Sequence, residues 1–307
     1  MSAGVTSVVS AGECMIELVE LGDGLMRRGF GGDTLNTAIY LRRCLDPQRC
    51  TVSYMTVLGD DPYSDEMVGT WKGEGLDCSL VGRSPGSLPG IHAVRTDASG
   101  ERMFHYWRDR APVRDLYRDD AYAELLAAST SADLFYFSGI TLAILDDPSR
   151  HRLLDDLRRR RENGGRIAFD PNLRLRIWQD AGIARHWFKA VYPLCDFLLP
   201  TFDDEIALWR DSSPQDVIER IGEQTEGEIV VKCGSDATHA RACGQGVSVK
   251  PETVRDPVDT TGAGDSFNAA YLAARLEGAS LQEAVHAGQN LAAHVIRHPG
   301  AIAPPLG

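Results

Sequence analysis

The chain has 307 residues, of which 43% are hydrophobic and 25% charged, and its formal net charge is −12. This length and apolar content are enough for one large α/β domain, and no apolar run reaches the ~18 residues of a membrane span. The acidic balance argues against general nucleic-acid affinity, because a phosphate backbone is held chiefly by excess Lys and Arg.

Short apolar runs alternate with amphipathic stretches from one end of the chain to the other. The first residues lack a basic segment and a cleavage site, so we expect a cytoplasmic protein. Strands are predicted at residues 5–11, 52–58, 134–137, 166–169, 197–199 and 229–232, and helices at 33–45, 62–74, 148–163, 203–210, 214–224, 262–277 and 280–297. This alternation indicates an α/β fold with a doubly wound, mostly parallel sheet flanked by helices.

Two regions break this rhythm. Residues 16–30 and 88–107 have the pattern of short alternating strands with Gly and Asp turns, and a hairpin is predicted around Asp97 to Gly100. We therefore expect a small β substructure, formed by about 14–30 and 88–110, inserted in a single domain that covers residues 1–307.

Between these regions, the segment Gly29-Phe-Gly-Gly-Asp-Thr-Leu-Asn36 opens a predicted helix. Gly31 and Gly32 would let the backbone pass close to a ligand, and the Asn36 amide could both donate to and accept from hydroxyl groups. An ordinary helix start with Asp33 or Thr34 as N-cap is compatible with the same residues.

Tyr106 and Arg108 alternate along a predicted strand, so both side chains should face one side. Asn172 and Arg174 follow the strand that ends near Asp170, and ligands of open α/β sheets bind at the carboxyl ends of strands. Two convergent guanidinium groups suit a carboxylate, because each can pair with it bidentately. An acidic sugar therefore fits Arg108 and Arg174 better than a neutral one.

The most informative segment is Asp256-Pro-Val-Asp-Thr-Thr-Gly-Ala-Gly-Asp-Ser-Phe267, which ends a turn and opens a helix. Thr261, Gly262, Ala263 and Gly264 would offer backbone N–H groups at a helix N-terminus, where a phosphate can approach. Asp265 lies one residue inside that turn and could accept a proton from an attacking alcohol. Asp259 could contact a ligand or a cation, or brace the loop through Thr260 or Thr261.

This segment resembles the D-T-x-G-A-G-D signature of phosphofructokinase-B type (ribokinase-like) carbohydrate kinases, and the G-G-D-T-L-N run is similar to their sugar-binding motif. The resemblance spans the chain, and residues 12–18, 106–108 and 175–178 look most like bacterial 2-keto-3-deoxygluconate kinases. It implies ATP and Mg²⁺ as cofactors, Asp265 as base, the turn from Gly262 to Gly264 as anion hole, and a β lid that often packs against a second subunit.

The resemblance also implies residues on the nucleotide side. Asn172, Lys232, Gly234, Thr261, Gly262, Gly264 and Asn290 are expected to contact ATP. The family's N-x-x-E motif is replaced here by Thr201-Phe-Asp-Asp204, so Asp204 takes the position that helps to hold Mg²⁺. Acidic residues in the first turn of a helix would have the same appearance.

Three functions are compatible with these patterns. The first is an ATP-dependent kinase for the terminal hydroxyl of 2-keto-3-deoxygluconate. A fructokinase or ribokinase that acts on a neutral sugar is the second, and a sugar-binding protein without turnover is the third. The arginines favour the first over the second, and the complete anion turn with its Asp favours a kinase over the third.

Overall fold

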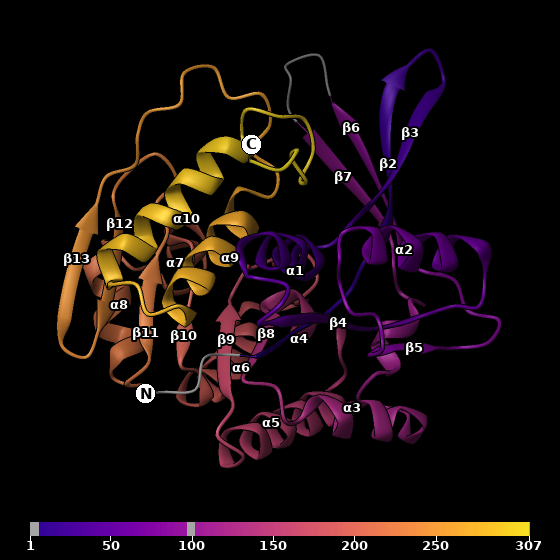
Figure 1. Ribbon diagram of the computed structural model, residues 1–307, viewed down its shortest axis with the longest axis horizontal. Helices are drawn as coiled ribbons and strands as arrows, with labels where there is room; N and C mark the ends of the chain where they lie inside the picture. The colour runs from indigo at the N-terminus through magenta and orange to yellow at the C-terminus, as the bar shows by residue number, and fades with distance from the viewer. Residues whose placement is uncertain (1–5, 97–101, 307) are drawn as a thin grey trace.

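The computed structural model describes residues 6–96 and 102–306 (Figure 1). Within these residues the main sheet has nine strands in the order β13-β12-β11-β10-β9-β8-β1-β4-β5. The strands are β1 (Ser7–Ala11), β4 (Thr51–Leu58), β5 (Val81–Arg83), β8 (Leu134–Ser138), β9 (Arg166–Asp170), β10 (Phe197–Leu198), β11 (Glu228–Val231), β12 (Thr238–Ala242) and β13 (Gln245–Val249). Only β12 runs in the opposite direction, pairing antiparallel with both β11 and β13, so the expected mostly parallel sheet is confirmed.

Helices cover both faces of this sheet (Figure 1). They are α1 (Asp33–Cys44), α2 (Pro62–Gly73), α3 (Ala123–Ser129), α4 (Gly139–Ile144), α5 (Asp147–Glu162), α6 (Ala181–Val191), α7 (Phe202–Trp209), α8 (Pro214–Gly222), α9 (Ala263–Leu276) and α10 (Leu281–Val295). Val8 packs in the core with α1, α9 and α10, whereas Val9 packs in the opposite core with α5 and α6. Successive strand residues point to opposite faces, which explains why the buried strands are apolar throughout.

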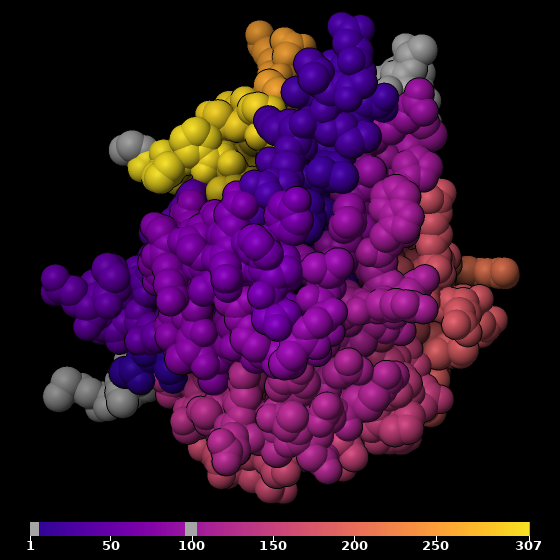
Figure 2. Space-filling model, turned by 90° about the vertical axis from the view of Figure 1, so that its right-hand side faces the viewer, coloured from indigo at the N-terminus to yellow at the C-terminus, as the bar shows by residue number. Residues whose placement is uncertain are grey.

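The two segments that break the rhythm pair with each other in a separate sheet. Its order is β3-β2-β6-β7, formed by β2 (Met15–Gly22), β3 (Leu25–Gly31), β6 (Ile91–Thr96) and β7 (Arg102–Trp107). The turn predicted at Asp97 to Gly100 lies outside the described residues. Figure 1 shows this sheet standing away from the main body, and in Figure 2 its β2 and β3 strands rise at the top of the face in view. We refer to the four strands as the small sheet.

Several elements were not predicted from the sequence. The β12–β13 hairpin turns at Cys243 and Gly244, both with positive φ, and its strands are half polar. Helix α6 begins after Asp180, whose carboxylate accepts N–H groups of the first turn. The hairpin forms one edge of the main sheet, where its strands alternate polar and apolar residues, whereas α6 lies inside the alternation and connects β9 to β10. No helix within the described residues is long and apolar enough to cross a membrane.

The topology brings together polar residues that are far apart in the chain. They lie where the parallel strands of the main sheet have their carboxyl ends, which we call the carboxyl edge of the sheet. Glu13 follows β1, Asp170 ends β9, and Lys232 follows β11. Parallel strands place their carboxyl ends on the same side, and the N-termini of α1 and α9 meet there as well. The small sheet overhangs this edge (Figure 1).

Candidate active site

A cavity of about 1720 Å³ lies between this edge and the small sheet. Sites for one small molecule usually measure roughly 300–1,000 Å³, so this cavity has room for more than one ligand. Thirteen of the predicted site residues line it: Gly31, Gly32, Asn36, Tyr106, Arg108, Asn172, Arg174, Asp204, Lys232, Thr261, Gly262, Gly264 and Asp265. Ala263, Gly234 and Asn290 do not, and Asn290 is exposed on α10.

The turn before α9 uses its two glycines for different reasons. Gly262 has φ 77°, and a Cβ there would lie 2.6 Å from the carbonyl oxygen of Ala301. Only glycine fits that position without strain. At Gly264 a Cβ would meet nothing closer than the Lys232 Nζ at 3.8 Å, so the space beside it is open.

The first turn of α9 also presents unused donors. The backbone N–H groups of Gly264 and Asp265 have no hydrogen-bond partner among residues 6–96 and 102–306. Free N–H groups at a helix N-terminus, together with the helix dipole, form an anion site. The turn can therefore receive a phosphate beside Gly264.

Asp265 lines the cavity and is hydrogen-bonded to a residue from α1. The Asn36 Nδ2 donates to Asp265 Oδ2 at 2.8 Å, which joins two predicted site residues that are far apart in the chain. Burial, followed by the negative charges of Asp33 and Asp170, raises the pKa of the Asp265 carboxyl to about 7, although Asn36 and Lys232 act in the opposite direction. A carboxylate with a pKa near neutrality is well suited to accept a proton.

A second network supports the floor of the cavity. Lys232 Nζ lies 2.8 Å from Asp170 Oδ2 and 2.9 Å from Asn268 Oδ1. Asn268 Nδ2 also donates to Asp170 Oδ2 at 2.6 Å and to the Tyr136 hydroxyl at 3.1 Å. The Lys232 charge is thus compensated within the protein. Asn268 was not predicted, although it lies one helical turn after Asp265 on the same helix.

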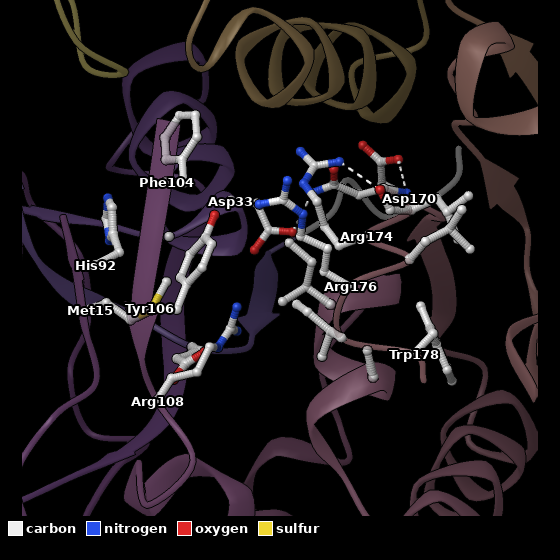
Figure 3. A pocket seen from close by; sticks show the side chains of 18 of the residues that line it. Met15, Asp33, His92, Phe104, Tyr106, Arg108, Asp170, Arg174, Arg176 and Trp178 are labelled. Atoms are coloured by element: carbon white, nitrogen blue, oxygen red, sulfur yellow. Dashed lines mark hydrogen bonds and ion pairs between the residues drawn. The ribbon is translucent and has the colours of Figure 1, made fainter. Parts of the chain in front are cut away.

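The loop after β9 is fixed by carboxylates on both sides. Asn172 has a positive φ of 32°, and its Nδ2 donates to Asp33 Oδ2 at 2.7 Å. The Leu173 N–H donates to Asp204 Oδ2 at 3.0 Å. Arg174 follows and extends into the cavity opposite Tyr106 (Figure 3).

The acidic residues at the start of α7 do not act together. Glu205 is buried against Arg220, with 2.5 Å between Oε2 and the guanidinium, whereas Asp203 and Asp204 line the cavity. No group of three metal-ligating side chains occurs within the described part of the chain. Asp203, Asp204 and Glu205 therefore do not form one oxygen-rich cluster, because Glu205 turns toward Arg220.

Two further expectations are refined by the structure. A Cβ on Gly32 would lie 2.1 Å from the backbone oxygen of Glu13, so the close approach at Gly32 is to the protein's own chain. Asp259 accepts the N–H groups of Thr261 at 3.0 Å and Gly300 at 2.8 Å. It braces the loop, which was one of the two roles expected for it.

The wall formed by the small sheet contains a buried ion pair that was not predicted. Tyr106 and Arg108 both line the cavity, as their alternation predicted, but Arg108 is only 7% exposed and pairs with Glu13, which is 3% exposed. Burial raises the pKa of the Glu13 carboxyl, and the charges of Arg108 and Arg114 oppose that rise. Glu13 directly follows a predicted strand, so the rule that ligands gather at strand ends could have identified it.

Comparisons with known proteins match nearly the whole chain. The family model for pfkB family carbohydrate kinases matches residues 5–306. The chain is 42% identical to the 2-dehydro-3-deoxygluconokinase of Escherichia coli (strain K12) over 297 residues, which cover 95% of this chain and 96% of that protein. It is 41% identical to the enzyme of the same name from Dickeya dadantii, with 97% of each chain covered.

A solved structure of another sugar kinase shares this fold. The crystal structure of a fructokinase with bound ATP from Xylella fastidiosa superposes with a TM-score of 0.82 at 19% identity, covering 96% of this chain and 93% of that one. At that identity the similarity concerns the fold alone. The family match over nearly the whole chain and the identity above 40% identify this protein as a member of the pfkB family of carbohydrate kinases.

Proposed function

We propose that the protein transfers the γ-phosphoryl group of ATP to the terminal primary hydroxyl of 2-keto-3-deoxygluconate, also called 2-dehydro-3-deoxygluconate. The products would be ADP and 2-keto-3-deoxy-6-phosphogluconate. The observation that carries the chemistry is the position of Asp265, whose pKa is raised to about 7, beside the free N–H groups at Gly264. The substrate follows from the names of the relatives at about 42% identity. Because ATP is the donor, we also propose a cytoplasmic location.

In this mechanism Asp265 accepts the proton of the attacking hydroxyl. The substrate oxygen forms a bond to the γ-phosphorus, and the bond from that phosphorus to the bridging oxygen of ADP breaks. The N–H groups of Gly264 and Asp265 stabilise the negative charge on the transferred group, because preorganised donors act where charge develops. Asn36 orients the base through its hydrogen bond to Oδ2. Phosphoryl transfer depends mostly on such positioning and charge stabilisation.

Mg²⁺ would neutralise charge on the β- and γ-phosphates when ATP is bound. Asp203 and Asp204, whose carboxylates line the cavity, are the residues that would hold it. Mg²⁺ usually combines one or two carboxylates with phosphate oxygens and water, so this donor set fits the ion. On the nucleotide side we propose Thr261, Gly262, Gly264, Asn172 and Lys232, with Gly234 and Asn290 further out.

The sugar would lie between Gly31, Asn36 and the wall of Tyr106, with Arg174 opposite (Figure 3). We propose that the small sheet is a lid over this sugar and belongs to one kinase domain. Arg174 has no ion-pair partner among the described residues, so its charge is available to a substrate carboxylate. A neutral sugar, as phosphorylated by fructokinases or ribokinases, has no need of that charge.

A screen of ADP release over acidic and neutral sugars tests this proposal. We expect the highest kcat/KM with 2-keto-3-deoxygluconate, and phosphate on its terminal carbon by phosphorus NMR. Faster turnover of fructose or ribose would favour the neutral-sugar alternative. Sugar binding without any ADP release would identify a binding protein that has lost turnover.

We also propose that the protein forms a homo-oligomer through the lid. The strands of the lid expose several apolar side chains, among them Leu25 at 65% and Trp107 at 62% exposure, which contact with a second copy could cover. The other members are Leu21, Met26 and Met103. Light scattering of the wild type and of Leu25→Glu tests this; a monomeric wild type at micromolar concentration would contradict it.

A further inference from the structure

The cations of the cavity fall into two groups. Arg108, Arg150 and Lys232 each have a carboxylate partner: Glu13, Asp147 and Asp170 respectively. Arg114, Arg174 and Arg176 line the same cavity and have no ion-pair partner within residues 6–96 and 102–306. A ligand that brings a negative charge will be attracted chiefly by the second group, because the charges of the first are already compensated.

Charge compensation is most complete at the wall formed by the small sheet, which we call the lid wall. Glu13 and Arg108 form a neutral pair, and a substrate carboxylate beside it would meet both a cation and an anion. The pair still has polar capacity for a ligand, since Glu13 Oε1 and Arg108 Nε are buried without a hydrogen-bond partner among the described residues. Glu13 Oε1 can accept a hydrogen bond and Arg108 Nε can donate one, which suits an uncharged hydroxyl or carbonyl group of a ligand. Any net positive charge on this wall therefore comes from another cation.

Arg114 is the residue placed to do so. It is half-buried in the short 3₁₀ helix Pro112–Asp115, and its backbone N–H donates to Ala111 at 3.1 Å. Arg114 lines the same cavity as Glu13 and Arg150, and its charge opposes the rise in the pKa of Glu13 and lowers the pKa of Arg150. Arg174 and Arg176 are exposed on the opposite wall, where Figure 3 shows them facing Tyr106 and Arg108.

We propose that Arg114 determines the preference for an acidic sugar by supplying the positive charge that Glu13 removes from Arg108. The inference rests on the proposed function and adds to it a specificity residue outside the motifs of the family resemblance. In this arrangement Arg114 and Arg174 approach the substrate carboxylate from opposite walls. The Glu13–Arg108 pair contacts uncharged oxygens of the same molecule.

The test compares two substrates that differ only in charge at one carbon. They are 2-keto-3-deoxygluconate and 3-deoxyfructose, in which a CH₂OH group replaces the carboxylate. For Arg114→Gln we expect kcat/KM and binding affinity to fall at least about tenfold for the acid and less than about twofold for the neutral sugar, because a partly desolvated charge pair is lost only with the acid. Arg114→Lys should restore part of the loss.

The matched control is Arg110→Gln, an exposed arginine of the same loop that does not line the cavity. It should leave both substrates unchanged, and thermal melting should show that all variants are folded. Equal losses on the two sugars, or no loss on the acid, overturn the role of Arg114 while leaving the kinase assignment intact. A wild-type enzyme that does not phosphorylate the keto acid overturns the proposed function and this inference together.

Discussion

The two walls of the cavity are built in different ways. On the α9 wall, the turn, the free N–H groups and the proposed base Asp265 come from one continuous segment, residues 259–265. On the lid wall, Arg108 depends on Glu13, which is 95 residues away in the chain. The α9 wall depends on the backbone conformation of one short segment. The lid wall depends on a balance between charges that come from separate elements. We therefore expect mutations on the α9 wall to affect chemistry and those on the lid wall to affect stability and substrate choice.

The largest expected effect is the loss of stability in Glu13→Ala, which tests the lid wall. This substitution leaves the guanidinium of Arg108 buried without a counter-charge, and breaking a buried ion pair typically costs about 3–5 kcal/mol. Urea denaturation at neutral pH would measure this loss. The double variant Glu13→Leu, Arg108→Met should be closer to the wild type in stability, because it removes both charges. If Glu13→Ala unfolds at the wild-type urea concentration, the pair is not a structural element.

Asp265→Asn tests the α9 wall. If Asp265 accepts the substrate proton, kcat should fall at least about 10²-fold while sugar affinity and melting temperature change little. The control is Asp236→Asn, an exposed acidic residue that does not line the cavity. A variant that retains more than about a third of wild-type kcat would remove Asp265 from this role.

Substitutions at the two glycines of the turn distinguish a role in ATP binding from a role in folding. Gly264→Val places bulk where a phosphate is expected, yet a Cβ there meets only Lys232 Nζ at 3.8 Å. We expect a folded protein whose KM for ATP rises about tenfold, which corresponds to about 1.4 kcal/mol. Gly262→Ala should instead lower the melting temperature, because its Cβ would press on Ala301. Unchanged ATP kinetics in folded Gly264→Val would show that the turn only begins the helix.

The smallest expected effect is a shift in the pH dependence of kcat/KM. Since burial and the charges of Asp33 and Asp170 raise the pKa of Asp265 to about 7, the base is protonated at lower pH. The kcat/KM of the wild type should therefore be full above pH 7 and decline as pH falls through about 7. Asp33→Asn removes one of the charges that raise this pKa, so the decline should move to lower pH. A profile that does not move in Asp33→Asn would mean that Asp33 does not act on the base.

Much of this protein can be inferred from short stretches of sequence. The alternation of apolar runs and amphipathic segments determines a parallel sheet between helices, because both patterns reflect local periodicity and burial. Asp265, Gly262 and Gly264 could be predicted to line one cavity for the same reason: adjacent residues at a helix start share one local geometry. The observed start of α9 differs from the prediction by a single residue, Ala263 instead of Gly262.

Only the tertiary structure decided which charges are available. From the sequence, Arg108 was predicted to pair with a substrate carboxylate and Arg114 was not singled out. The fold buries Arg108 against Glu13 and leaves Arg114 without an ion-pair partner among the described residues. It likewise places Asn36 on Asp265 across 229 residues, and turns Glu205 away from Asp204 toward Arg220. Electrostatic interactions depend on distance and burial in space, and these quantities are set by long-range packing that no local pattern contains.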